Sequence, residues 1–252
     1  MKVLCVGDIH GKSELVNKAF DTFLKGKYDQ IIFHGDIADG DKKDEEIIRC
    51  FNIIIGMKRT YPDQVVILVG NHEEQYFHLQ NEFYRCSGYR ESLYYHLYPL
   101  LSENRNLFRY AYGIKNYLFT HAGVNAGWFI KHYDTIYKWS KTMGLDIVEI
   151  DQWWQIFDGI SQTKDKPILF EVGPDRGGKA KGIGGPLWCD MSEMIYHKPV
   201  MGLHQVVGHT QQHFMRRVTA FGDKPKFLNK DTSVTFIDVL NDRHQFLTLE
   251  IE

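Results

Sequence analysis

Near its start the chain runs Val3-Leu4-Cys5-Val6-Gly7-Asp8-Ile9-His10-Gly11, four apolar residues leading directly into a glycine turn. The apolar run predicts a short strand buried on both faces, and the glycine predicts the turn that ends it. The pattern returns at residues 31–33 and 65–69, while residues 13–24 and 44–57 carry apolar residues at helical spacing. Strand, helix, strand, helix, strand in this order predicts an α/β fold whose parallel sheet is covered on both faces.

Further strands are predicted in the second half of the chain. Residues 117–119 predict a strand that ends at His121, and residues 206–207 predict one that ends just before His209. Apolar and polar residues alternate around residues 234–236 and 247–251, which predicts antiparallel strands.

Two segments between these strands are rich in aromatic residues. Eight of the 14 tyrosines lie between Tyr76 and Tyr112, and all five tryptophans lie between Trp128 and Trp188. Both segments have helical character, and we expect about residues 75–112 and 125–200 to be helical insertions on a single domain spanning residues 1–252. For the tyrosines, packing within the helical segment is favoured over a surface on which nucleobases stack.

Composition excludes several classes of protein. Of the 252 residues, 43% are hydrophobic and 25% charged, which excludes a disordered chain, a collagen-like repeat and a coiled coil. The net charge of −2 argues against strong duplex nucleic-acid binding. No apolar run approaches the ~18 residues of a membrane span, so no membrane partner is expected. The four cysteines are scattered and no signal peptide is evident, so we expect a reduced, cytoplasmic protein.

Five predicted strand ends carry the same kind of signal, a turn beside carboxylate, imidazole or amide side chains. They are Gly7-Asp8-Ile9-His10-Gly11, Gly35-Asp36-Ile37-Ala38-Asp39-Gly40, Gly70-Asn71-His72-Glu73, Thr120-His121-Ala122-Gly123 and Gly208-His209-Thr210. In open α/β sheets ligands bind at the carboxyl ends of the strands. Nitrogen and oxygen donors without thiolates suit Mn²⁺, Fe or Zn²⁺, and six such ligands suffice for two ions that share a carboxylate.

In this order, the five blocks resemble the calcineurin-like metallophosphoesterase superfamily, specifically its branch of PPP-type serine/threonine phosphatases with their phage and bacterial relatives. The resemblance implies a four-layer αββα sandwich. It also implies a phosphoric ester hydrolase that depends on two divalent metal ions, most simply a phosphomonoesterase similar to serine/threonine protein phosphatases. The implied partner is a phosphorylated substrate, whether a phosphoprotein, a nucleotide or a small phosphoester.

The resemblance also implies a role for each residue. Mn²⁺ is the favoured ion, with Fe or Zn²⁺ as alternatives, and the implied ligands are Asp8, His10, Asp36, Asn71, His121 and His209. Asp8 and His10 would hold the first ion, Asp36 would bridge both, and the other three would hold the second. A hydroxide between the ions would attack phosphorus directly, so no phosphoenzyme is expected.

Two further residues are implied to be catalytic. His72 would be the general acid that protonates the leaving oxygen, and Asp39 would orient His72 and keep it protonated. Glu73 would support the site from behind its ligands.

One residue departs from the pattern of the superfamily. An arginine that clamps phosphate follows the second aspartate there, whereas Gly40 follows Asp39 in this chain. Because a phosphoryl group needs positive donors besides the metals, we expect Arg176, in the glycine-rich loop of residues 173–182, to bind the substrate.

Two other functions remain open. One is a nucleotide-directed hydrolase, either a dinucleoside polyphosphatase or an RNA-end phosphatase or phosphodiesterase, because the same branch contains these. The other is a catalytically silent metal-binding module used for protein interaction. A paired His72 and Asp39 argue against the silent module, because such a module has no need of a leaving-group acid.

Overall fold

The computed structural model describes residues 1–79, 81–219, 232–240 and 243–252. The chain divides into two compact units. The first unit consists of Met1–Arg109 and Val239–Glu252, and the second unit consists of Tyr110–Asp238. Each unit contains one five-stranded sheet with helices packed on it, so the chain is a mixed α/β protein, as the sequence predicts.

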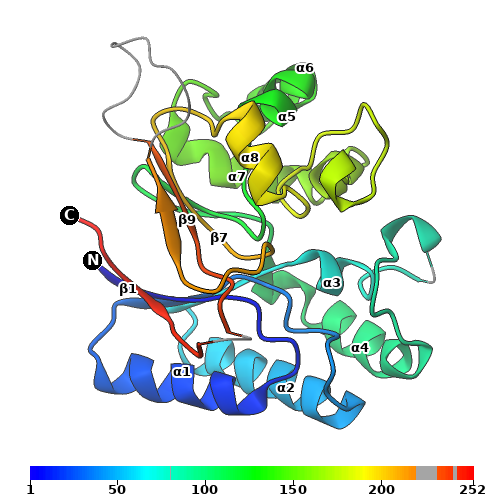
Figure 1. Cartoon of the computed structure of the whole chain (residues 1–252), viewed down its shortest axis with the longest axis vertical. Coiled ribbons are helices and arrows are strands. Elements are labelled where there is room, and N and C mark those ends of the chain that lie inside the picture. The colour runs from blue at the N-terminus through cyan, green and yellow to red at the C-terminus, as the bar shows by residue number, and fades with distance from the viewer. Residues whose placement is uncertain (80, 220–231, 241–242) are drawn as a thin grey trace. The chain divides into compact units, whose positions relative to one another are not determined.

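The first unit follows the predicted alternation of strands and helices. Its elements are β1 (Lys2–Val6), α1 (Ser13–Lys25), β2 (Gln30–Phe33), α2 (Asp44–Thr60), β3 (Val65–Leu68), α3 (Asn71–Glu74), η1 (Glu82–Tyr84), α4 (Glu91–Glu103), η2 (Arg105–Leu107), β4 (Phe108–Arg109) and β10 (Leu247–Glu250). The helices α1 and α2 pack against each other along the same side of this unit (Figure 1).

The sheet of the first unit has the order β10-β1-β2-β3-β4. β1, β2, β3 and β4 are parallel, and β10 pairs antiparallel with β1, as the alternation around residues 247–251 predicts. All residues of β2 and β3 are buried, which confirms the prediction of a sheet covered on both faces. The two chain ends meet beside this sheet, where the Met1 amino group donates a 2.7 Å hydrogen bond to the Ile251 carbonyl (Figure 1).

The prediction of a mainly helical segment from residue 76 to residue 112 holds only for α4. Between residues 75 and 90 the described residues form turns and the single 3₁₀ turn η1. Pro99 lies inside α4 rather than interrupting it, and Leu93, Leu97 and Leu101 of that helix are buried. Burial of this apolar stripe outweighs the cost of the proline.

The tyrosines of this segment mainly pack against other side chains. Tyr76, Tyr84 and Tyr94 are buried, and the ring of Tyr94 stacks on that of Tyr98 with centroids 5.4 Å apart. This agrees with the packing interpretation of the tyrosine cluster.

The second unit contains the remaining strands and helices. Its elements are β5 (Tyr112–Ile114), β6 (Tyr117–Phe119), α5 (Ala126–Lys131), α6 (Tyr133–Thr142), η3 (Ile150–Gln152), α7 (Trp153–Ile160), η4 (Lys166–Phe170), η5 (Pro174–Arg176), α8 (Met191–His197), β7 (His204–Val207), β8 (Arg216–Val218) and β9 (Ser233–Phe236). The predicted strands at residues 117–119 and 206–207 are therefore present, and helices occupy much of the predicted insertion at 125–200.

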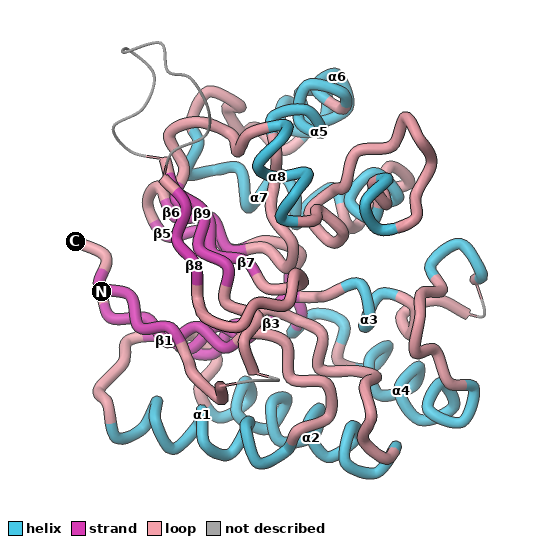
Figure 2. The backbone as a smooth tube through the Cα atoms, in the orientation of Figure 1, coloured by secondary structure: helices cyan, strands magenta, loops and turns pink. Residues whose placement is uncertain are grey.

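The sheet of the second unit has the order β5-β6-β7-β9-β8, and its strands lie together in Figure 2. β6, β7 and β9 are parallel, whereas β5 and β8 pair antiparallel with their neighbours. The antiparallel pairing predicted around residues 234–236 is thus correct for the β8 side of β9 and wrong for the β7 side. Alternation in sequence reports the two faces of a strand and not the direction of its neighbour.

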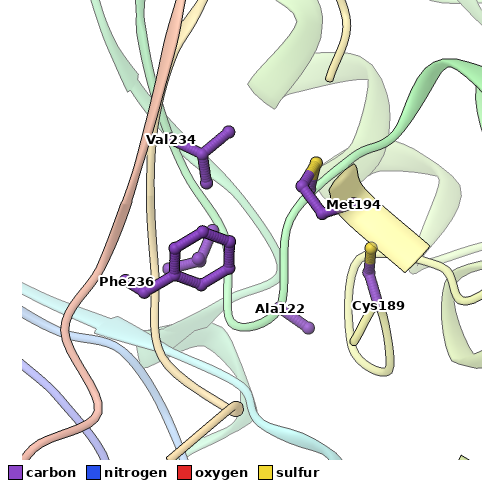
Figure 3. Packing of buried hydrophobic residues seen from close by; sticks show 6 residues of the cluster. Ala122, Cys189, Met194, Val234 and Phe236 are labelled. Carbon is purple, nitrogen blue, oxygen red and sulfur yellow. The ribbon is translucent and has the colours of Figure 1, made fainter. Parts of the chain in front are cut away.

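A compact apolar cluster fixes α8 and the segment just before it to this sheet. It is made by Ala122, Cys189, Met194, Val207, Val234 and Phe236, all buried (Figure 3). Ala122 directly follows the candidate residue His121, so this cluster anchors the backbone that presents His121.

All four cysteines are free, and three of them are buried. Among the described residues, no helix combines the length and the apolar character that crossing a membrane requires.

Candidate active site

The candidate residues of the first unit all lie just past the carboxyl ends of adjacent parallel strands. Asp8 follows β1, Asp36 follows β2 and Asn71 begins α3 after β3. All three side chains are buried, with residue exposures of 1–2%. Parallel strands end at the same edge of their sheet, which explains why residues far apart in sequence meet here.

Asp8, His10 and Asp36 form a compact set of potential ligands. One ligand atom from each lies within 4.8 Å of the others. The Asp36 backbone carbonyl also accepts hydrogen bonds from the Ile9 and His10 N–H groups at 3.0 and 2.8 Å, so the first two blocks are tied together. Two carboxylates and an imidazole at this spacing fit a divalent metal ion.

The ring of His10 is oriented for ligation through Nε2. Its Nδ1 lies 3.0 Å from the Ala38 carbonyl, which can only accept, so Nδ1 carries the proton. Nε2 then keeps its lone pair and lies 4.0 Å from Oδ2 of Asp36. Burial lowers the pKa of His10 although the Asp36 charge opposes this, which favours the neutral ring that metals bind.

The backbone is strained at the candidate residues. Among the described residues, eight non-glycine residues have positive φ, and four of these are His10 (46°), Asp36 (47°), Asp39 (60°) and His209 (62°). Such conformations cost about 1–3 kcal/mol each and persist where the surroundings enforce them, which is typical of functional sites.

Glu73 enforces the turn that carries Asp36. Its carboxylate accepts four backbone hydrogen bonds, from the N–H groups of Asp36, Ile37, Ala38 and Gly70, at 2.7–2.8 Å. The side chain is fully buried. The supporting role predicted for Glu73 thus has a specific form: it holds the second and third blocks in register.

Gly70 permits the closest approach between those blocks. A Cβ at Gly70 would lie 2.1 Å from Oδ1 of Asp36 and 2.5 Å from its backbone nitrogen. Any other residue at position 70 would therefore displace the Asp36 carboxylate.

His72 is paired with Asp39, as the sequence resemblance implies. Nδ1 of His72 donates to Oδ2 of Asp39 at 2.7 Å. The backbone N–H of His72 donates to Oδ1 of Asp36 at 3.1 Å, and Nε2 lies 3.9 Å from Oδ2 of Asp36. Burial alone would lower the pKa of His72, but the Asp36 charge and the hydrogen bond to Asp39 outweigh it and raise the pKa well above its usual range.

Two residues that the sequence did not single out complete this pair. Gln75 Nε2 donates to Oδ2 of Asp39 and the Tyr76 hydroxyl donates to Oδ1, both at 2.5 Å. The Tyr76 oxygen in turn accepts the Arg90 N–H at 3.2 Å. Asp39 therefore accepts three side-chain hydrogen bonds. The only sequence signal for the two donors is their position three and four residues after His72.

A cavity of about 520 Å³ opens beside these groups within the first unit. It is lined by His10, Lys12, Gly40, Asp41, His72, Ser87 and Gly88. His10 and His72 both line this cavity, so a substrate bound here would contact the candidate proton donor and one candidate metal ligand together.

In the second unit, His121 and His209 lie just past the parallel neighbours β6 and β7. Both residues are buried, and Nε2 of His121 is 3.2 Å from Nδ1 of His209. Two ring nitrogens bound to one ion at about 2.1 Å are separated by a similar distance, so the pair fits a shared ion.

Arg176 lies next to His209 in the second unit. Its Nη2 donates to the His209 carbonyl at 3.3 Å and to the Thr210 hydroxyl at 3.2 Å. Its Nε also forms a 2.7 Å ion pair with Asp190. The guanidinium is therefore held rigidly beside a candidate ligand, and part of its charge is already paired.

The sequence model of the calcineurin-like phosphoesterase family matches residues 1–212. Among solved structures, the cold-active protein-tyrosine phosphatase of the psychrophile Shewanella sp. has a TM-score of 0.52 at 17% identity, covering 99% of this chain and 75% of that chain. A mutant cold-active protein tyrosine phosphatase has a TM-score of 0.54 at 16% identity, with the same coverages of 99% and 75%. At these identities the likeness concerns the fold. No curated protein sequence matches the chain.

Proposed function

Because the chain belongs to the calcineurin-like phosphoesterase family and is thus a metal-dependent phosphoester hydrolase, we propose that it acts as a phosphomonoesterase of the serine/threonine phosphatase type. The observation that carries the proposal is the His72–Asp39 pair, whose free ring nitrogen lies 3.9 Å from the carboxylate of Asp36. A proton donor next to a carboxylate that can bind metal is what hydrolysis of an ester with a poor leaving group requires.

The proposed metal ligands are those of the five sequence blocks. Asp8 and His10 would hold one ion, Asp36 would bridge, and Asn71, His121 and His209 would hold the second. When bound, the ions would supply an activated water and positive charge for the reacting phosphoryl group. We propose Mn²⁺ as the native ion, with Fe or Zn²⁺ as alternatives that the same nitrogen and oxygen donors would also bind.

His72 transfers the proton, and Asp39 orients the ring of His72. Nε2–H of His72 gives its proton to the leaving oxygen as the bond between that oxygen and phosphorus breaks, and Nε2 is later reprotonated by solvent. Asp39 holds Nδ1–H, so the ring keeps one orientation throughout. The attacking oxygen comes from water, so no phosphoenzyme forms.

Three finer assignments belong to the same proposal. Arg176 binds a phosphate oxygen from beside His209, an assignment supported by the rigid placement of its guanidinium. The whole chain works as a single metallophosphoesterase domain, supported by a family match that runs through most of both units. The free state of all four cysteines supports a reducing, cytoplasmic location.

The test is hydrolysis by the full chain after chelation and after reloading with Mn²⁺, Fe²⁺ or Zn²⁺. The substrates are p-nitrophenyl phosphate, its bis-ester, a phosphoserine peptide, a phosphotyrosine peptide and a dinucleoside tetraphosphate. We expect metal-dependent turnover of the monoesters, with the phosphoserine peptide preferred over the phosphotyrosine peptide.

Each other outcome points to a different assignment. Preference for the dinucleoside tetraphosphate would favour the nucleotide-directed hydrolase, and preference for the bis-ester would favour a phosphodiesterase. Absence of turnover on every substrate with every metal, in protein that binds metal, would favour the silent module. An unchanged kcat/KM in Arg176→Ala would show that Arg176 does not bind the substrate.

A further inference from the structure

One basic side chain lines the cavity beside His10 and His72. Among the described residues, those that line the cavity include one lysine, Lys12, and no arginine. Lys12 is half-buried and directly precedes α1 (Ser13–Lys25). Its backbone is fixed on both sides: its N–H donates to the Ile9 carbonyl at 3.2 Å, and its carbonyl accepts the Leu15 N–H at 2.9 Å.

Position 40 cannot itself supply a positively charged side chain to the cavity. Gly40 has φ of +90°, and a Cβ there would lie 2.8 Å from Cβ of His10 and 3.1 Å from the His10 carbonyl oxygen. A side chain at position 40 would therefore strain the backbone and press on His10. Gly40 leaves room in the cavity without contributing a side chain to it, and Lys12 lines the same cavity.

We propose that Lys12 binds a non-bridging oxygen of the substrate phosphoryl group in this cavity and makes the site selective for phosphomonoesters over phosphodiesters. The inference rests on the proposed function of the same site. A monoester is largely a dianion at neutral pH and a diester is a monoanion, so a positively charged ammonium favours the monoester. Hydrogen bonds between ionised partners are also about twice as strong as neutral ones.

Lys12 is suited to this role by the size and shape of its charge. The ammonium group is a compact point charge with three donors on a flexible stem, so it can follow one phosphate oxygen without the planar fit that a guanidinium needs. The neighbouring residue Asp41 also lines the cavity, and it is exposed. Solvent screens an exposed charge, so Asp41 offsets little of the attraction.

The test compares Lys12→Met and Lys12→Gln with Lys12→Arg and with the control Lys25→Met. Lys25 lies at the other end of α1, exposed and paired with Asp21 at 3.0 Å. Two quantities are measured on the Mn²⁺-loaded full chain: kcat/KM for p-nitrophenyl phosphate and for its bis-ester, and the Kd of inorganic phosphate by calorimetry.

We expect both neutral variants to lose about 10- to 100-fold in kcat/KM on the monoester and less than about threefold on the diester. The Kd of phosphate should rise by about tenfold. Lys12→Arg should retain most of the selectivity, and Lys25→Met should match the wild type in every measurement.

Failure of this inference is distinct from failure of the proposed function. If the wild type hydrolyses neither ester, the proposed function fails, and the phosphate Kd of the Lys12 variants still decides whether Lys12 binds phosphate. If the wild type is active and the neutral variants keep the wild-type ratio of monoester to diester activity, the role of Lys12 in selectivity is overturned. An unchanged phosphate Kd in a folded Lys12→Met or Lys12→Gln protein overturns phosphate binding.

Discussion

Nδ1 of His72 lies 2.7 Å from Oδ2 of Asp39, and this contact decides which ring nitrogen of His72 is available for chemistry. Because the carboxylate can only accept, the proton on Nδ1 is committed to Asp39. Nε2 is then the nitrogen that faces Asp36 and reaches the cavity. The geometry thus agrees with separate proposed tasks for the two carboxylates: Asp39 would orient the ring, and Asp36 would be a metal ligand.

Replacing His72 should impair the reaction according to the leaving group. His72→Asn removes the proton donor, so kcat on an alkyl phosphate or phosphoserine peptide should fall by about 10²- to 10⁴-fold. Loss on p-nitrophenyl phosphate should be small, because nitrophenolate leaves without protonation. Steady-state kinetics on both substrates, with metal content as a control, measure the difference. Equal losses on the two substrates would contradict the role as acid.

Tyr76 should act through Asp39 and His72 rather than on the substrate. Tyr76→Phe removes one of three hydrogen bonds to Asp39 and leaves the aromatic ring in place. We expect about a tenfold loss of kcat on the alkyl phosphate, little change on p-nitrophenyl phosphate and an unchanged KM. Tyr95→Phe, at an exposed tyrosine of α4, is the matched control. A loss of the same size on both substrates would indicate a general structural effect instead.

The two sets of metal ligands should be separable by metal content. His121→Ala and His209→Ala should each reduce bound Mn²⁺ from about two ions to about one per chain, and Asp8→Asn should remove the other ion. Elemental analysis after dialysis, without any activity assay, measures the stoichiometry. His96→Ala, at an exposed histidine, is the control. Two ions retained in a folded His209→Ala protein would exclude His209 from the site.

Glu73 should be important for the stability of the fold. Glu73→Gln replaces one acceptor oxygen by a donor amide, so at least one buried N–H group of the turn loses its partner. We expect about 3 kcal/mol of lost stability. Urea unfolding followed by circular dichroism measures it, with Glu82→Gln, at an exposed glutamate, as the control. A loss below about 0.5 kcal/mol would show that these backbone groups find other partners.

The sequence predicted the fold and the candidate ligands for one physical reason. Buried parallel strands are short continuous apolar runs, and their carboxyl ends share one sheet edge, so residues after each run are brought together by topology alone. Asp8, Asp36 and Asn71 were found in this way, and the structure places them after three adjacent strands of the first unit.

Other features had no periodic signal in the sequence. Gln75 and Tyr76 lie in a segment that the sequence predicts as helix. Their side chains donate hydrogen bonds to Asp39, and the segment forms turns. Tertiary contacts of this kind outweigh local helix propensity. Likewise, the absence of an arginine after Asp39 was visible in the sequence. The reason that no side chain fits there, the positive φ of Gly40 against His10, was not.

Glu171 in the second unit gives a pH-dependent prediction that is independent of metal. Burial alone would raise the pKa of Glu171, but hydrogen bonds from His132 at 2.6 Å and from Lys131 outweigh it and lower the pKa. A carboxylate with a lowered pKa stabilises the fold above its unfolded pKa of about 4.3, and this contribution is lost as pH falls through the folded pKa. Glu171→Gln should therefore destabilise the protein at pH 7 and differ progressively less from the wild type below about pH 4.3. Urea unfolding of both proteins between pH 3.5 and 7 measures this difference, with Glu149→Gln, at an exposed glutamate, as the control. A stability difference that grows as the pH falls would reverse the sign and contradict the stabilising role of the ionised carboxylate.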